Sequence, residues 1–120
     1  MSEKRILLIE DEATTREILT EVLRGEGYEV DSVATAGAAT TCLESIRYAL
    51  VMADWLLPDG HGTDVADTAA ELGSKTLIVS GYLSELPAGV ADRHQLLSKQ
   101  SSHVEILAAV QRSIGGPEDD

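Results

Sequence analysis

The fold is decided by a short apolar run that ends in acidic residues: Ile6–Glu12 has the sequence ILLIEDE. Four consecutive apolar residues without alternation are typical of a strand that is covered on both faces of its sheet. Two more runs of this kind, one alternating segment and one short segment follow, and we expect strands at 28–33, 49–53, 76–79 and 95–98. The segment 28–33 alternates between apolar and polar residues, which favours a strand at the edge of the sheet.

Longer stretches with apolar residues at helical spacing separate the strands. We expect helices at about 13–24, 36–46, 65–72 and 104–114. The segment 82–93 is the least helical stretch, because Pro87 and Gly89 interrupt it. Strands that alternate with helices predict the α/β class, here a doubly wound five-stranded parallel sheet with helices on both faces.

Length and charge limit the possible functions. The chain of 120 residues has the length of one domain, with an expected core at about 4–114 and a flexible polar tail at 115–120. Nine basic and 21 acidic residues give a net charge of −12, which repels nucleic-acid phosphates and anionic membranes. We therefore expect no direct nucleic-acid partner and no membrane partner, and the charge favours Mg²⁺ or a basic protein surface.

The sequence predicts a cytoplasmic protein. A single cysteine, Cys42, allows no internal disulfide, and its place on an apolar helix face indicates a packed thiol. The first residues carry no signal-peptide pattern, and no apolar run approaches the roughly 20 residues of a membrane span. The glycines and proline at 115–117 leave open that the chain is one domain of a longer protein.

Polar residues follow the predicted strands at the edge where a doubly wound sheet places its binding site. They are Glu10, Asp11, Asp54, Ser80 and Lys99. Three carboxylates at one edge repel one another unless each turns into water or they share a cation, and hard oxygen ligands fit Mg²⁺. The alternative is that these acids cap the helices that follow them.

The hydroxyl and the ammonium group in this set favour a site for phosphoryl transfer. A carboxylate that carries a phosphoryl group needs neighbouring positive charge and a hydrogen-bond donor. In this hypothesis Asp54 attacks phosphorus, the metal and Lys99 balance the charge on the phosphoryl oxygens, and Ser80 donates a hydrogen bond.

The motifs at the strand ends, in this order, resemble those of the receiver domains of two-component response regulators. The resemblance extends from Lys4 to about Ile114 and rests on ILLIEDE at 6–12, DWLLP at 54–58, Gly62, IVSG at 78–81 and LSK at 97–99. It implies a flavodoxin-like (βα)5 fold with strand order 2-1-3-4-5. It also implies a role in a phosphorelay, in which a histidine kinase or a phosphotransfer protein phosphorylates the domain and changes its contacts with other proteins.

The resemblance implies a role for each residue of the site. Asp54 is the phosphoacceptor, Ser80 is the switch hydroxyl, and Lys99 is the cation that contacts the phosphoryl group. The ligands of Mg²⁺ are the carboxylates of Glu10, Asp11 and Asp54 and the backbone carbonyl of Leu56. Such a domain is a signalling phosphoacceptor rather than an enzyme.

Three features depart from the usual pattern of receiver domains. Gln100 follows Lys99, where most receivers have a proline with a cis peptide bond before it. Leu96 stands where many receivers have a switching aromatic residue. The segment between Ser80 and Lys99 is shorter than usual, so we expect a stunted fourth helix and not the common rearrangement of hydroxyl, aromatic residue and helix.

Two other functions stay open as hypotheses. A receiver-like interaction module that is never phosphorylated would have the same fold. A phosphohydrolase that forms an aspartyl phosphate usually carries a second aspartate two residues after the nucleophile, where this chain has Leu56. Intact mass after incubation with acetyl phosphate and Mg²⁺, compared between wild type and Asp54→Ala, is the most informative single experiment.

Overall fold

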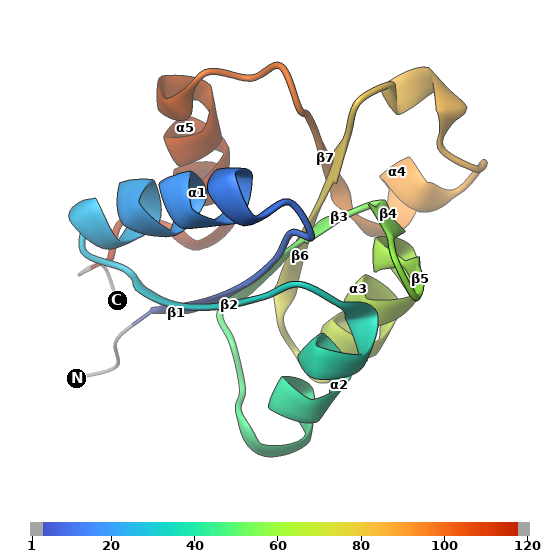
Figure 1. Cartoon of the computed structure of the whole chain (residues 1–120), viewed down its shortest axis with the longest axis horizontal. Helices are drawn as coiled ribbons and strands as arrows, with labels where there is room; N and C mark the ends of the chain where they lie inside the picture. Colours follow the sequence, from blue (N-terminus) through green and yellow to red (C-terminus); the bar gives the residue numbers. More distant parts are fainter. Residues whose placement is uncertain (1–3, 118–120) are drawn as a thin grey trace.

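Five parallel strands form the central sheet of the computed structural model, which describes residues 4–117 (Figure 1). They are β1 (Arg5–Ile9), β2 (Glu29–Val33), β3 (Leu50–Asp54), β6 (Lys75–Ser80) and β7 (Gln95–Ser98). Their order in the sheet is β2-β1-β3-β6-β7, and every neighbouring pair is parallel. The expected flavodoxin-like (βα)5 fold with order 2-1-3-4-5 is confirmed, since β6 and β7 are the fourth and fifth strands of this sheet.

Helices cover the sheet on both faces (Figure 1). One face carries α1 (Ala13–Gly25) and α5 (His103–Ile114). The other face carries α2 (Ala36–Ser45), α3 (Gly62–Glu71) and the four-residue α4 (Val90–Arg93). This arrangement is the doubly wound architecture that the alternation of strands and helices predicted.

Two hydrophobic cores, one on each face, explain the continuous apolar runs. Along β1, Leu7 packs toward α2 and α3, while its neighbour Leu8 packs toward α1 and α5. Along β3, Val51 packs on the same face as Leu7, and Met52 packs on the same face as Leu8. Successive side chains of a strand point to opposite faces, so a strand between two helical layers needs apolar residues at every position.

The connection after β3 contains a feature that the sequence did not predict. The expected loop is a small antiparallel hairpin of β4 (Leu56–Leu57) and β5 (Gly60–His61), and α3 begins directly after it. The weak helical character predicted for 82–93 is confirmed, because this segment holds a single turn of 3-10 helix, η1 (Leu83–Glu85), and the short α4.

The described part of the chain ends beside its beginning. The Tyr28 hydroxyl donates a hydrogen bond of 2.8 Å to the carbonyl of Gly115, and the Lys4 ammonium donates one of 2.5 Å to the carbonyl of Ile114. These contacts hold the first residue of the expected tail at 115–120, whose residues 118–120 lie outside the described part. Among residues 4–117, no helix has both the length and the apolar character that crossing a bilayer requires.

Candidate functional site

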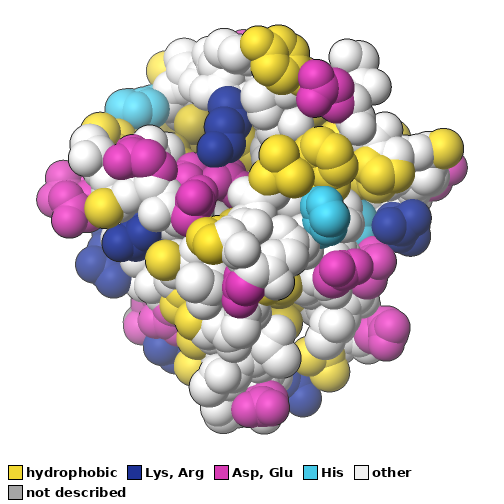
Figure 2. All heavy atoms as spheres, turned by 45° about the vertical axis from the view of Figure 1, so that its right-hand side comes forward, with side chains coloured by type: hydrophobic (Ala, Val, Ile, Leu, Met, Phe, Trp, Pro, Cys, Tyr) yellow, Lys and Arg dark blue, Asp and Glu magenta, His cyan; other side chains and the backbone are white. Residues whose placement is uncertain are grey.

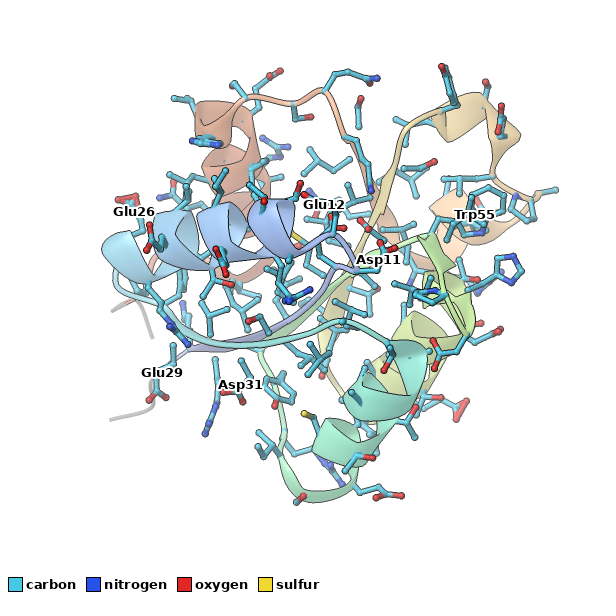
Figure 3. The ribbon with its side chains drawn as sticks, viewed as in Figure 1. Asp11, Glu12, Glu26, Glu29, Asp31 and Trp55 are labelled. Atoms are coloured by element: carbon cyan, nitrogen blue, oxygen red, sulfur yellow. The ribbon has the colours of Figure 1, made fainter. Side chains whose placement is uncertain are left out.

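The carboxyl ends of four strands bring the predicted site residues to one edge of the sheet. Glu10 follows β1, and Asp54 is the last residue of β3. Both are buried, with 2% and 3% of their surfaces exposed, whereas Asp11 is exposed. One carboxylate oxygen from each of these three residues lies within 4.8 Å of the other two. Figure 3 shows Asp11 at the turn from β1 into α1, on the same edge as Trp55.

A single ammonium group faces the two buried carboxylates. Lys99 Nζ donates a hydrogen bond of 3.1 Å to Asp54 Oδ2 and lies 3.7 Å from Glu10 Oε1. The backbone amide of Lys99 donates to the Ser80 carbonyl at 2.9 Å, which continues the pairing of β7 with β6 beyond its last residue. The lysine is therefore fixed at the sheet edge by its backbone as well as by its charge.

The electrostatics of the cluster favour additional positive charge. Burial raises the pKa of Asp54 to about 8, and the neighbouring Glu10 carboxyl adds to the rise while Lys99 opposes it. Burial lowers the pKa of Lys99, but the hydrogen bond to Asp54 and the charges of the surrounding carboxylates together outweigh this effect and raise the pKa overall. One ammonium group thus offsets only part of the repulsion among three carboxylates.

The turn between β1 and α1 shows which acidic residue caps the helix and which one belongs to the carboxylate cluster. The Glu12 carboxylate caps α1 by accepting hydrogen bonds from the amides of Thr14 and Thr15. Glu10 Oε2 accepts a hydrogen bond of 3.0 Å from the Glu12 amide and stays buried beside Asp54. The capping role belongs to Glu12, and Glu10 belongs to the carboxylate cluster.

Arg16 is a contributor to this turn that sequence reasoning missed. Its guanidinium donates to the carbonyls of Glu10 and Asp11 at 3.0 Å and 3.4 Å. The residue lies one turn inside α1, and its sequence position carries no signal beyond the helical spacing. It fixes the backbone from which the two carboxylates project.

The hairpin after Asp54 brings the Leu56 backbone to the site. The Gly62 amide donates a hydrogen bond of 2.7 Å to the Trp55 carbonyl, and Leu56 pairs with His61. Hydrogen-bonded and non-hydrogen-bonded pairs alternate in an antiparallel ladder, so the Leu56 carbonyl is left outside the hairpin. Gly62 is required here, since a Cβ at this position would lie 1.9 Å from the Asp54 carbonyl oxygen.

The donor set fits a magnesium ion. Carboxylate oxygens from Glu10, Asp11 and Asp54 lie within 4.8 Å of one another, all of them hard ligands, and this group includes no sulfur or imidazole ligand among the described residues. Two of the three carboxylates are buried and repel each other, so a divalent cation would relieve a repulsion that is present in the metal-free fold. The three carboxylates expected to hold Mg²⁺ are therefore together in space, and Leu56 lines the cavity beside Asp54.

Ser80 lines the same cavity as Asp54 and Lys99. This cavity has a volume of about 110 Å³, and its lining also includes Leu56 and Gly81. The Ser80 hydroxyl donates to the Tyr82 carbonyl at 3.2 Å and accepts from the Tyr82 amide at 3.3 Å. In this state the hydroxyl contacts the entrance of the segment 82–93 and not the Asp54 carboxylate.

Exposed hydrophobic side chains gather on the face that carries the cavity (Figure 2). Near its mouth, Leu56 is 61% exposed and Tyr82 is 67% exposed. Trp55 packs partly into the core, with its ring centroid 5.6 Å from that of His61. Between Lys99 and Gln100 the peptide bond is trans, as are all peptide bonds within residues 4–117.

Comparison with known proteins identifies the family. Residues 6–111 match the model of the response regulator receiver domain. The chain belongs to this family. The receiver domain family serves signalling rather than classical enzymatic catalysis, and the expectation of a two-component signalling domain is confirmed.

Two curated relatives are longer response regulators. The DNA-binding response regulator MtrA of Mycobacterium tuberculosis is 40% identical over 62 residues, which are 52% of this chain and 27% of that protein. The cell cycle transcriptional regulator CtrA of Caulobacter vibrioides is 31% identical over 121 aligned positions, which are 92% of this chain and 52% of that protein. The chain thus spans about half, or less, of the length of these curated relatives.

A solved structure with a similar fold and sequence contains Mg²⁺ and BeF. The response regulator TrrA of Thermotoga maritima, crystallised in complex with Mg²⁺ and BeF, is 28% identical with a TM-score of 0.82. The alignment covers 91% of this receiver domain and 97% of that chain. The similarity therefore extends over nearly the whole fold, including the edge of the sheet that carries Asp54.

Proposed function

We propose that the chain is the phosphoacceptor of a two-component or phosphorelay system in the cytoplasm, and that Asp54 is the residue that accepts the phosphoryl group. The observation that carries this proposal is the position of Asp54. Its buried carboxylate lines an open cavity, Lys99 Nζ lies at 3.1 Å, and the carboxylates of Glu10 and Asp11 are within 4.8 Å. The Ser80 hydroxyl and the Lys99 ammonium line the same cavity as Asp54, so a carboxylate, a cation and a hydroxyl lie together there.

The phosphoryl donor is a histidine kinase or a phosphotransfer protein. An Asp54 carboxylate oxygen attacks phosphorus, a P–O bond forms, and the P–N bond of the donor phosphohistidine breaks. The donor imidazole keeps the electron pair of that bond and takes up a proton. Lys99 moves from the carboxylate toward the phosphoryl oxygens, and Ser80 exchanges its contact with Tyr82 for a hydrogen bond to them.

The residues that would hold the magnesium ion are Glu10, Asp11, Asp54 and the carbonyl of Leu56. When bound, the ion supplies positive charge that keeps the carboxylates ionised and offsets the charge of the incoming phosphoryl group. Glu10 is oriented for this role by the amide of Glu12, and Asp11 projects from a turn that Arg16 holds.

The output is a change in protein contacts. The segment 82–93 begins at the Ser80 hydroxyl and is the part of this face with the least regular structure, so it is the segment through which we propose the change is transmitted. The net charge of −12 supports the proposal that this domain contacts proteins and not nucleic acid directly. MtrA is named as DNA-binding, but this chain aligns with only 27% of that protein.

Intact mass spectrometry tests the proposal. Incubation with acetyl phosphate and Mg²⁺ should add the mass of one phosphoryl group to the wild type, and both EDTA and Asp54→Ala should abolish the gain. Asp92→Ala removes an exposed carboxylate from α4 and serves as the matched control that is still labelled. Full labelling of Asp54→Ala would contradict the assignment, and an unlabelled wild type would favour the interaction module that is never phosphorylated.

A further inference from the structure

The hairpin after Asp54 is fastened at its tip to a distant helix. Asp59 lies in the two-residue loop between β4 and β5, and its carboxylate accepts two backbone hydrogen bonds. Oδ1 accepts from the Ala36 amide at 2.8 Å, and Oδ2 accepts from the Gly37 amide at 2.9 Å. These two residues begin α2 and precede Asp59 by 23 and 22 positions in the sequence.

The contact joins groups that are well matched. The first amides of a helix have no partner within the helix, and the helix dipole favours a negative charge beside them. Hydrogen bonds to an ionised acceptor are stronger than those between neutral groups. In agreement with this, the hydrogen bonds from Gly37 and Ala36 hold the pKa of Asp59 below its ordinary value. A Cβ on Gly37 would lie 3.3 Å from Asp59 Oδ2, so glycine permits the close approach.

Capping of α2 does not by itself require Asp59. The helix has a local cap, because the Thr35 hydroxyl accepts a hydrogen bond of 3.1 Å from the Ala38 amide. Asp59 therefore adds a second fastening from another part of the chain. Its effect falls on the hairpin, whose first strand has only two residues: Leu57 packs into the core, whereas Leu56 is 61% exposed and has no such packing.

The hairpin lies between two fixed points. At its base, the Trp55 carbonyl accepts from Gly62 and the Trp55 amide donates to Val79, which ties this end to β6. At its tip, the Asp59 carboxylate accepts hydrogen bonds from the first two amides of α2. The Leu56 carbonyl, which is a ligand of the magnesium ion in the proposed function, lies between these two points.

We propose that Asp59 is a positioning residue for the phosphoacceptor site: its grip on the first amides of α2 fixes the hairpin and holds the Leu56 carbonyl in place beside Asp54. This inference rests on the proposed function, because it concerns the geometry of the same metal and phosphoryl site. Asp59 itself touches neither the Asp54 carboxylate nor the other carboxylates of the cluster.

The test compares Asp59→Ala with Thr35→Ala, which removes a cap from the same helix end without touching the hairpin. Both substitutions should lower the melting temperature by a few degrees, because each leaves amides of α2 without their partner. Only Asp59→Ala should weaken Mg²⁺ binding, by about tenfold as is usual for loss of an outer partner of a metal site. Emission of Trp55, the sole tryptophan, reports binding directly beside the site. Asp59→Asn keeps one good acceptor oxygen, so its affinity for Mg²⁺ should lie between those of the wild type and Asp59→Ala.

Hydrogen exchange of the metal-free protein provides a readout that does not depend on the proposed function. Amides of the hairpin at 56–61 should exchange faster in Asp59→Ala than in the wild type and should be unchanged in Thr35→Ala. Equal loss of Mg²⁺ affinity in both variants, or a hairpin and an affinity that are unaltered in Asp59→Ala, would overturn the inference and leave Asp59 as a helix cap only. A wild type that binds no Mg²⁺ and accepts no phosphoryl group would instead refute the proposed function, while the exchange of the hairpin amides would still decide the role of Asp59.

Discussion

Asp54 lies buried beside a second buried carboxyl group, that of Glu10, and the Lys99 ammonium faces both. Water screens repulsion between like charges poorly when both are out of its reach. The residues of the site therefore oppose the stability of the metal-free fold, and they favour whatever brings positive charge to this edge of the sheet.

Replacement of the acceptor by its neutral isostere should stabilise the metal-free protein. Burial and the Glu10 carboxyl oppose ionisation of Asp54, and Asp54→Asn removes this cost while it keeps the shape of the side chain, so the free energy of unfolding should rise by about 1 kcal/mol in EDTA. Urea unfolding at neutral pH measures the change, and Asp92→Asn on the surface of α4 should leave it unaltered. Added Mg²⁺ should stabilise the wild type through mass action, so the difference in the free energy of unfolding between wild type and Asp54→Asn should become smaller. A loss of stability in Asp54→Asn under metal-free conditions would contradict this argument.

Among the elements, those with strong local patterns could be predicted from the sequence. The run 49–53 is apolar throughout because helices cover both faces of β3, and Pro87 and Gly89 shorten the fourth helix. The acids at the strand ends could be predicted for the same reason, since parallel strands bring their carboxyl ends to one edge. The hairpin at 56–61 could not, because it depends on the contact of Asp59 with a helix 22 residues away, which no local pattern carries.

The segment 82–93 should respond to phosphorylation more than any strand of the sheet. In the free protein its regular structure is one 3-10 turn and the four-residue α4, and Tyr82 is 67% exposed. Its amides should exchange quickly with solvent and should become protected when beryllofluoride and Mg²⁺ draw Ser80 toward the site. Hydrogen exchange followed by mass spectrometry measures both states. Protection in the free protein equal to that of β3 or β6 would show that the segment is not mobile.

The far end of this segment is anchored to α3 by a buried histidine. His94 Nδ1 lies 2.5 Å from the Thr76 hydroxyl, and His94 Nε2 lies 2.6 Å from Asp67 Oδ1, which also accepts from Arg93. Burial alone would raise the pKa of Asp67, but the hydrogen bonds from Arg93 and His94 outweigh it and hold the pKa below its ordinary value. The ionised form of Asp67 therefore stabilises the packing of α4 on α3.

The loss of stability caused by removing the Asp67 carboxylate should depend on pH. Asp67→Ala should cost about 1–3 kcal/mol at neutral pH, because it leaves a buried polar group of His94 without its partner. The folded-state pKa of Asp67 is below the unfolded-state value, so its contribution is complete above about pH 4 and is lost as the pH falls through the lower folded-state value. Urea midpoints of wild type and variant should converge in acid, and a difference that grows as the pH falls would refute the role of the carboxylate.

The whole molecule carries 21 acidic side chains, and the account requires that one of them accept the phosphoryl group. Most are exposed, and an ion pair at the surface stabilises the position of its partners only weakly. Asp54 differs because the sheet edge buries it, Lys99 contacts it, and a cavity of about 110 Å³ opens on it. Selectivity among chemically equal groups is thus a property of the fold. Glu10 is also buried beside Lys99, but its Oε2 accepts a hydrogen bond from the Glu12 amide, and Lys99 Nζ lies nearer to Asp54, at 3.1 Å against 3.7 Å.

Mapping of the phosphoryl group over the whole chain examines this selectivity. The protein is incubated with acetyl phosphate and Mg²⁺, reduced with borohydride, which converts an aspartyl phosphate to homoserine, and analysed peptide by peptide. The account predicts that homoserine appears at position 54 and at no other aspartate, and that omission of Mg²⁺ removes it. Homoserine at Asp11 or Asp59 with none at Asp54, or label spread over many surface acids, would contradict the assignment of Asp54 as the phosphoacceptor.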